Sequence, residues 1–240
     1  MRESNDPSAR CTMSDVESSS AALSHPSSGG ELAAAVRKRP KPGERRVQIL
    51  QALASMLEQP GAERITTAAL AARLSVSEAA LYRHFASKAQ MFEGLIEFIE
   101  QTVFSLINQI AERERASEVA DGGADTRAGA RQAGKVLAMV VQFAEKNPGM
   151  ARVMVGDALV FENERLQQRM NQFFDKIEST LKHNLRRAVE LGGSATPTVD
   201  TQVLASVLTA FLVGRLQRFA RSGFKRLPSE QLEASLNLML

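Results

Sequence analysis

The sequence predicts an all-α fold of about nine helices, and three observations support this prediction. From Glu44 onward, apolar residues recur with the spacing of helix faces. No run of alternating polar and apolar residues bounded by hairpin turns interrupts that pattern. Hydrophobic residues make up 44% of the 240 residues, which is enough to bury a core in one larger domain or two smaller ones.

Composition argues against several classes of protein. No stretch approaches the roughly 20 uncharged apolar residues that cross a bilayer, and no apolar signal region opens the chain, so we expect a cytoplasmic protein without membrane contact. The single cysteine, Cys11, excludes an internal disulfide framework and a thiolate metal cluster. We expect neither a metal nor a cofactor.

The first 42 residues are rich in Ser, Ala, Gly and Pro, and we expect this tail to be disordered because it cannot bury enough apolar surface. The run "RKRPKPGERR" (37–46) carries six basic side chains against one glutamate. It is either a solvated linker or an arm that reaches phosphates or an adjacent groove of a nucleic acid.

Two short helices follow a first helix expected at 44–58, which "QPG" (59–61) ends. Thr66 is the expected N-cap of the second helix, with Ile65 and Leu70 spaced as a hydrophobic staple. Ser77 is the expected N-cap of the third helix by the same reasoning, with Val76 and Leu81 as its staple.

A longer fourth helix is expected from Ser87, whose spacing to Gln90 is that of a capping box, to about residue 115. Beyond it, glycine-bearing breaks at 121–125 and 191–197 separate helices expected near 126–146, 148–156, 161–190, 199–221 and 228–239. One apolar stripe in this half is either core or dimer interface, and it comprises Val203, Leu204, Val207, Leu208, Phe211, Leu212, Leu216 and Phe219.

The second and third helices are separated only by "LSV", which is the pattern of a helix-turn-helix. Leu81 and Phe85 are expected to face inward, which leaves Tyr82, Arg83 and His84 outside, where their polar groups suit phosphates and base edges. Lys88 lies in the first turn of the fourth helix, where the dipole disfavours a cation and a phosphate would offset that penalty. Singly, Tyr82 and His84 could be ordinary surface residues; together they favour DNA.

The segment "ITTAALAARLSVSEAALYRHFASKAQMFEGLIEFI" resembles the DNA-binding domain of TetR-family regulators, whose signature includes "LYxHF" followed by a lysine. With "NPGM" and "FENERLQQRMNQFFDKIE", the chain from 44 to 240 is similar to the nucleoid-occlusion branch of that family. The resemblance implies a helix-turn-helix head (43–103) and a helical dimerisation and partner-binding body (104–240). It also implies a homodimer, with higher-order assembly on DNA left open, that binds a palindromic chromosomal site and antagonises polymerisation of FtsZ. Such a protein would be associated with the nucleoid.

Carried over by position, the family's DNA contacts are expected at eight residues of the head: Thr66, Thr67, Ser77, Glu78, Ala79, Tyr82, His84 and Lys88. We expect phosphate contacts from Thr67, Tyr82, His84 and Lys88, and base readout near Ser77 to Ala79. Most of the family has glycine where this chain has Ser75, and a left-handed conformation there would cost roughly 1 kcal/mol.

The resemblance also implies a groove between the fourth and fifth helices that receives the apolar C-terminal tail of FtsZ, lined here by Phe98, Met139, Lys146 and Asn147. Leu106 and Gln142 depart from the residue types expected in that groove. The simpler alternative is that Phe98, which lies off the apolar stripe of its helix, packs against a neighbouring helix.

Two other functions compete with nucleoid occlusion. A ligand-responsive TetR-type repressor would use the same head and would carry a closed cavity in the body. An enzyme is disfavoured, because His25, His84 and His183 are scattered along the chain and no glycine-rich phosphate loop follows a strand. The paired carboxylates of "ENE" (162–164) suit the start of a helix.

Overall fold

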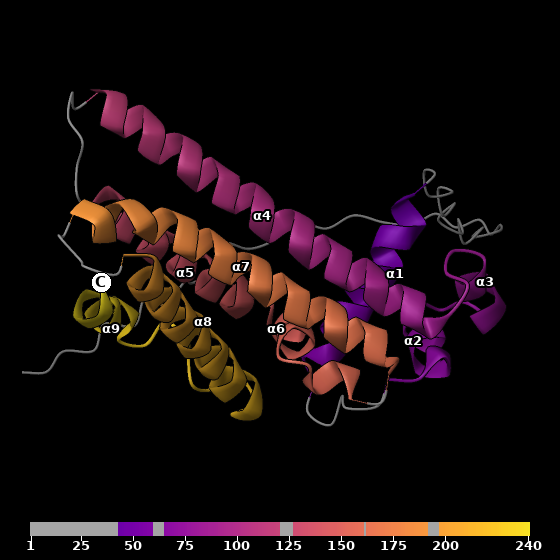
Figure 1. The fold of residues 1–240 in the computed structure, drawn as a ribbon. Helices are drawn as coiled ribbons and strands as arrows, with labels where there is room; N and C mark the ends of the chain where they lie inside the picture. The colour runs from indigo at the N-terminus through magenta and orange to yellow at the C-terminus, as the bar shows by residue number, and fades with distance from the viewer. Residues whose placement is uncertain (1–42, 60–64, 121–126, 161, 192–196) are drawn as a thin grey trace, which may run out of the picture. The chain divides into compact units, whose positions relative to one another are not determined.

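The computed structural model describes residues 43–59, 65–120, 127–160 and 162–191, together with 197–240. Within these ranges the chain forms helices and no strand, as the sequence predicts (Figure 1). The helices are α1 Glu44–Leu57, α2 Thr67–Arg73, α3 Glu78–Tyr82, α4 Lys88–Ala120, α5 Ala128–Lys146, α6 Pro148–Met154, η1 Asp157–Leu159, α7 Glu164–Leu191, α8 Pro197–Arg221 and α9 Leu232–Met239. The expected disordered tail lies outside the described residues.

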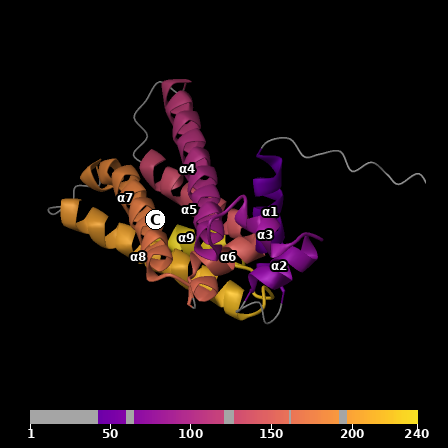
Figure 2. The same ribbon diagram turned by 90° about the vertical axis from the view of Figure 1, so that its right-hand side faces the viewer.

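Helix α4 connects the short helices to the longer ones. It packs against α1 near its start and then runs along α5 and α7 (Figures 1 and 2). The apolar side chains along one face of α4 are buried, from Phe92 and Ile96 through Ile99 to Val103 and Ile107. One continuous apolar core therefore extends from the helix-turn-helix into the long helices.

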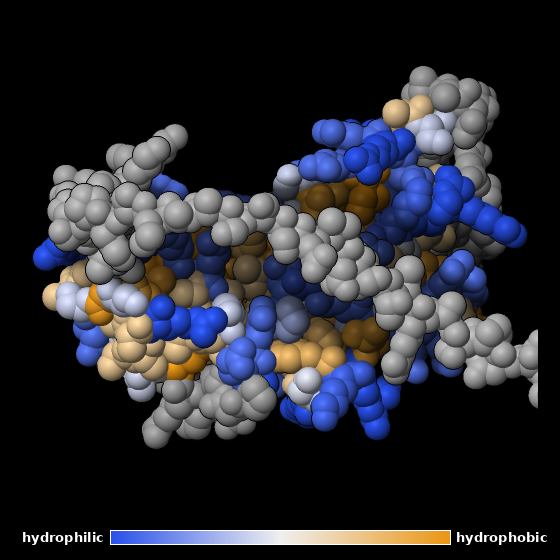
Figure 3. Space-filling model, turned by 180° about the vertical axis from the view of Figure 1, so that it is seen from behind, coloured by the Kyte–Doolittle hydropathy of each residue, from blue (hydrophilic) through white to orange (hydrophobic). Residues whose placement is uncertain are grey.

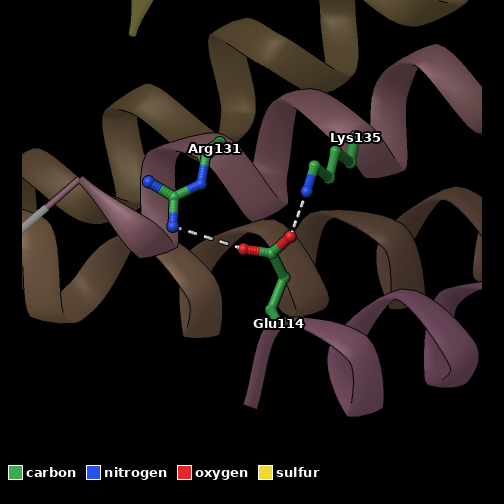
Figure 4. A network of polar contacts seen from close by, with 3 residues as sticks. All are labelled: Glu114, Arg131 and Lys135. Carbon is green, nitrogen blue, oxygen red and sulfur yellow. Dashed lines mark hydrogen bonds and ion pairs between the residues drawn. The ribbon is translucent and has the colours of Figure 1, made fainter. Parts of the chain in front are cut away.

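The far part of α4 is fastened to α5 by a buried carboxylate (Figure 4). Glu114 is only 6% exposed, and it accepts from Arg131 Nη2 at 3.5 Å and forms a second ion pair with Lys135 Nζ. A carboxylate this buried is tolerated when cations neutralise it and satisfy its oxygens. The pairing fixes the packing of α4 against α5 near the C-terminal end of α4, which is distant from the helix-turn-helix.

Helix α6 holds α1 at close range. A Cβ added to Gly149 would lie 2.0 Å from the carbonyl oxygen of Ala54, so only glycine allows this approach. Arg152 donates to the carbonyl of Gln59 at 2.9 Å and lies 4.9 Å from the ring centroid of Phe224. The end of α1, α6 and the segment after α8 are therefore joined at one place.

The C-terminal segment turns sharply before α9, which begins at Leu232 and not at residue 228 as the sequence predicts. Gln231 has a left-handed φ of 54°, and Arg215 Nη1 donates to the carbonyls of Pro228 and Glu230 at 2.9 and 2.6 Å. Burial lowers the pKa of Arg215 from its ordinary value, and Arg218 lowers it further while Glu230 opposes the shift. These contacts hold residues 228–231 outside the helix.

Helix α8 from Thr198 to Arg221 is long and apolar enough to cross a membrane by length and composition alone. Its packing gives a simpler account, because Leu208, Leu212 and Leu216 are buried within the core that α8 shares with α7. Seen from behind, hydrophilic side chains separate the apolar ones into several patches on the face shown (Figure 3).

Candidate nucleic-acid interface and partner surface

The helix-turn-helix is built by the two predicted N-caps. Thr66 Oγ1 accepts from the amide of Ala69 at 3.1 Å, and Ser77 Oγ accepts from the amide of Ala80 at 3.3 Å. Each hydroxyl satisfies a backbone N–H that the first turn of a helix leaves without a partner. The caps fix where α2 and α3 begin.

The turn between α2 and α3 depends on a strained serine. Ser75 has a φ of 52°, in the left-handed region where glycine is usual. The amide of Val76 donates to Ala71 at 3.0 Å and the amide of Ser75 donates to Ala72 at 3.1 Å, which is the pattern of a Schellman motif. The predicted departure from glycine is therefore accommodated without loss of the turn.

Helix α3 and the turn that follows it, which begins at Arg83, bury and expose their side chains as the sequence predicts. Leu81 and Phe85 are buried, at 0% and 1% exposure, whereas Tyr82 is 44% exposed. Arg83 and His84 are also exposed. This outer face directs a hydroxyl, a guanidinium and an imidazole to solvent. All three groups can donate hydrogen bonds to phosphate oxygens.

The N-terminal ends of α2 and α3 are linked across the turn. Thr67 Oγ1 donates to Glu78 Oε2 at 2.6 Å, so two of the predicted contact residues touch each other. Ser77, Glu78 and Ala79 are all exposed in the first turn of α3. Thr67 orients the Glu78 carboxylate, which then presents an acceptor of the kind that pairs with the cytosine amino group.

Arg46 completes this surface in a way that the sequence pattern does not predict. It belongs to the basic run but lies in α1, where its Nη1 donates to the carbonyl of His84 at 3.3 Å and its guanidinium lies 4.3 Å from the ring centroid of Phe85. Arg46 therefore binds a carbonyl of the turn that follows α3 and adds positive charge beside His84. Residues 37–42 of the run lie outside the described residues.

Lys88 has a partner within the chain that the sequence pattern does not predict. It lies in the first turn of α4, and its ammonium forms an ion pair with Glu162, just before α7. The expected capping box is present in modified form: Ser87 Oγ accepts from the amide of Gln90 at 3.2 Å, while Gln90 Oε1 accepts from the amide of Ala86 at 2.9 Å. The contact between Lys88 and Glu162 joins the predicted DNA-reading head to the body.

The four residues predicted for the partner groove come from α4, α5 and the residue that follows α5. Phe98 is 46% exposed, so about half of its surface stays open to solvent while the rest packs against the chain. Lys146 is exposed, Met139 is half-buried, and Asn147 Nδ2 donates to the carbonyl of Phe143 at 2.8 Å. Helices α4 and α5 pack directly against each other.

The apolar stripe of α8 is divided between the core and the surface. Leu204 and Phe211 are half-buried. Val199, Val203 and Val207 are 59%, 57% and 49% exposed and lie four residues apart on one face of the helix. The interpretation as core therefore holds for Leu208, Leu212 and Leu216, which are buried, whereas Val203 and Val207 are open to solvent in the single chain.

A cavity of about 640 Å³ lies among α4, α5 and α7 in the body. Phe104 and Ile107 supply apolar walls, while His183 and Asn184 belong to its polar side. Asn184 is 8% exposed, and its Nδ2 has no hydrogen-bond partner. Among the described residues, no group of three or more His, Cys, Asp or Glu side chains could hold a metal ion.

Two family models match the chain. The model described as "Bacterial regulatory proteins, tetR family" matches residues 49–95, which contain the helix-turn-helix. The model of the SlmA-like C-terminal domain, described as tetracyclin repressor-like, matches residues 130–240. Together the matches include both the predicted contact helix and the long helices.

Several relatives carry the name nucleoid occlusion factor SlmA. The protein of Vibrio vulnificus (strain YJ016) is 50% identical over 194 residues, covering 80% of this chain and 92% of that protein. The protein of Idiomarina loihiensis is 47% identical over 195 residues, covering 81% of this chain and 93% of its own.

Solved structures share the fold at low identity. The TetR family regulator PfmR of Thermus thermophilus has a TM-score of 0.62 at 22% identity, covering 80% of this chain and 97% of its own. The fatty acid degradation regulator FadR of Bacillus halodurans has a TM-score of 0.63 at 16% identity, covering 83% and 96%. At such identity the likeness concerns the fold alone.

Proposed function

Because this chain belongs to the TetR family of bacterial regulatory proteins, and within it to the SlmA group, we propose that it is a DNA-bound nucleoid occlusion factor that antagonises FtsZ polymerisation. The family consists of regulators and not of enzymes. The observation that carries the proposal is the capped helix α3 with the turn that follows it, which together expose Tyr82, Arg83 and His84. A protein of this kind works in the cytoplasm on the nucleoid.

On DNA, the N-terminal turn of α3 enters the major groove, and Ser77, Glu78 and Ala79 read base edges there. Thr67, Tyr82, His84 and Lys88 contact the flanking phosphates, with Thr66 at the same surface. Arg46, from α1, supports the turn that follows α3. Phosphate contacts hold the register and base contacts supply the specificity. Loss of a phosphate contact should therefore weaken binding to all duplexes alike.

Two copies of the chain place two such faces on one palindromic site. The exposed valines of α8, Val199, Val203 and Val207, give a face that a second copy can cover with the same residues, as a two-fold interface requires. A dimer matches its own symmetry to that of the DNA site, with half-sites separated by about one helical turn or a multiple of it.

FtsZ is the protein partner in this proposal, and its apolar C-terminal tail binds near Phe98. A phenyl ring that is 46% exposed offers an apolar anchor point, and the exposed Lys146 supplies a cation for an acidic or polar flank of the peptide. Met139 and Asn147 contribute the remaining wall. Helix α4 carries both Lys88 and Phe98, so DNA binding can bias the position of the partner surface.

Two variants separate the two surfaces. Tyr82→Ala should lose most DNA binding, which fluorescence anisotropy with a labelled palindromic duplex measures. The variant should keep its fold because the Tyr82 side chain is 44% exposed and contributes little to the core. Phe98→Ala should retain DNA binding and fail to disassemble FtsZ filaments in a pelleting assay. If Phe98→Ala disassembles filaments as well as the wild type does, the proposed partner surface is wrong.

One observation favours the second candidate function, a ligand-responsive repressor. The cavity of about 640 Å³ is large enough for a small molecule and borders Asn184, whose buried amide nitrogen has no hydrogen-bond partner. Mass spectrometry of the purified protein under native conditions tests this candidate. A ligand that co-purifies and releases DNA when added in excess would favour the repressor over the nucleoid occlusion factor.

A further inference from the structure

The ion pair between Lys88 and Glu162 lies between the helix-turn-helix head, which is proposed to bind DNA, and the helical body. Its members are 74 residues apart, one in the first turn of α4 and the other just before α7. The Lys88 side chain is 28% exposed and that of Glu162 is 11% exposed. The pair is therefore far less hydrated than a typical surface ion pair.

Each partner needs the other when DNA is absent. A lysine in the first turn of a helix opposes the helix dipole, and the Glu162 carboxylate offsets that opposition. A carboxylate that is 11% exposed would be costly to leave without a cation. The free protein is thus stabilised by a contact that keeps the Lys88 ammonium directed toward the body.

A DNA phosphate requires the same ammonium. Lys88 is six residues beyond Tyr82 and four beyond His84, so it follows directly on the surface proposed to contact phosphates. The phosphate and the Glu162 carboxylate have the same sign of charge and use the same kind of acceptor. Approach of the phosphate therefore either draws Lys88 away from Glu162 or brings two anions close together.

We propose that Glu162 competes with the DNA backbone for Lys88 and so limits the affinity of the protein for DNA. This inference rests on the DNA-binding role proposed above for the head. Glu162 is a positioning residue: it touches no DNA and acts through Lys88. In the free protein the ion pair stabilises the junction between α4 and α7, and on DNA that stabilisation is given up.

The proposal has a signature that an ordinary stabilising contact lacks, because stability and DNA affinity should change in opposite directions. Glu162→Gln removes the charge while keeping the shape of the side chain. The variant should melt at a lower temperature than the wild type and should bind duplex DNA about three- to tenfold more tightly at low salt. The gain should be equal for palindromic and scrambled duplexes, since phosphate contacts carry no sequence information.

A double-mutant cycle assigns the effect to Lys88. In a Lys88→Gln background, Glu162→Gln should leave DNA affinity unchanged, because the contested cation is absent. The matched control is Glu100→Gln, which breaks another α4–α7 ion pair, to Arg169 at 2.7 Å. That control should lower the melting temperature without tightening DNA binding.

Binding is measured by fluorescence anisotropy and folding by circular dichroism, both on the full chain. A gain that persists in the Lys88→Gln background would overturn the competition and point to simple removal of negative charge. Equal or weaker DNA binding by Glu162→Gln would also overturn it. If wild-type protein binds no duplex, the proposed DNA-binding function fails first, which is distinguishable from failure of the competition.

Discussion

Replacing Gly149 by alanine tests the close approach of the backbones of α1 and α6. The new Cβ would lie 2.0 Å from the carbonyl oxygen of Ala54 and 2.9 Å from its carbonyl carbon. Ordinary contact begins near 3.4 Å, so α1 and α6 would have to separate by about 1.4 Å. The obstacle is backbone and not a flexible side chain, so no rotamer change can relieve it.

Overpacking of this kind costs about 3 kcal/mol, at the upper end of the usual range. For a chain of this size such a loss corresponds to a fall in melting temperature of about 6 to 12 °C. The assay is thermal unfolding followed by circular dichroism at 222 nm. Urea unfolding at 25 °C gives the free energy of unfolding independently.

Gly134→Ala is the matched control, because Gly134 is also helical but its added Cβ would meet only side-chain carbons at ordinary contact distance, the nearest being Leu240 Cδ1 at 3.5 Å. Alanine there should raise the stability by about 0.5 to 1 kcal/mol through helix propensity alone. Equal melting temperatures for wild type and Gly149→Ala would refute the reasoning that α6 holds α1 by backbone contact. A loss of stability in both variants would instead point to a general intolerance of alanine.

Three further predictions concern the turn, the DNA face and the dimer. Ser75→Gly should raise the free energy of unfolding by about 1 kcal/mol, because the residue at φ 52° is relieved of left-handed strain; urea unfolding measures this, and a lower stability would contradict it. Tyr82→Phe should weaken binding to any duplex by about tenfold through loss of one hydrogen bond to a charged acceptor, with an unchanged melting temperature. Anisotropy with specific and scrambled duplexes checks that prediction, and a loss confined to the specific duplex would show that Tyr82 reads a base. Val203→Lys should shift the protein from dimer to monomer in analytical ultracentrifugation, because Val203 is 57% exposed in one chain and a buried interface excludes unpaired charge; a variant that remains dimeric would place the interface elsewhere.

The sequence predicts the helices and their starts well where a local signal exists. Thr66, Ser77 and Ser87 act as caps because a hydroxyl three residues before a backbone amide closes a local contact that the sequence already contains. The predicted start of α9 is wrong because Arg215, from the preceding helix, holds residues 228–231. No periodicity in the sequence encodes a contact of that kind.

The face proposed to bind DNA likewise combines features that local sequence predicts with contacts that only the folded chain creates. The inward positions of Leu81 and Phe85 follow from their spacing, and the burial of both confirms it. The contacts of Arg46 with His84 and of Lys88 with Glu162 join residues 38 and 74 apart, so only the folded chain brings them together. Exposure of Phe98 likewise depends on how other helices pack against α4, which helical spacing does not determine.

Sedimentation of FtsZ filaments in three arms tests the central claim most directly: with the protein alone, with the protein and a duplex carrying its palindromic site, and with the protein and a scrambled duplex. The account predicts that pelleted FtsZ falls sharply only in the arm with the specific duplex. Equal amounts of pelleted FtsZ in all three arms, under conditions where the protein binds its duplex, would contradict it.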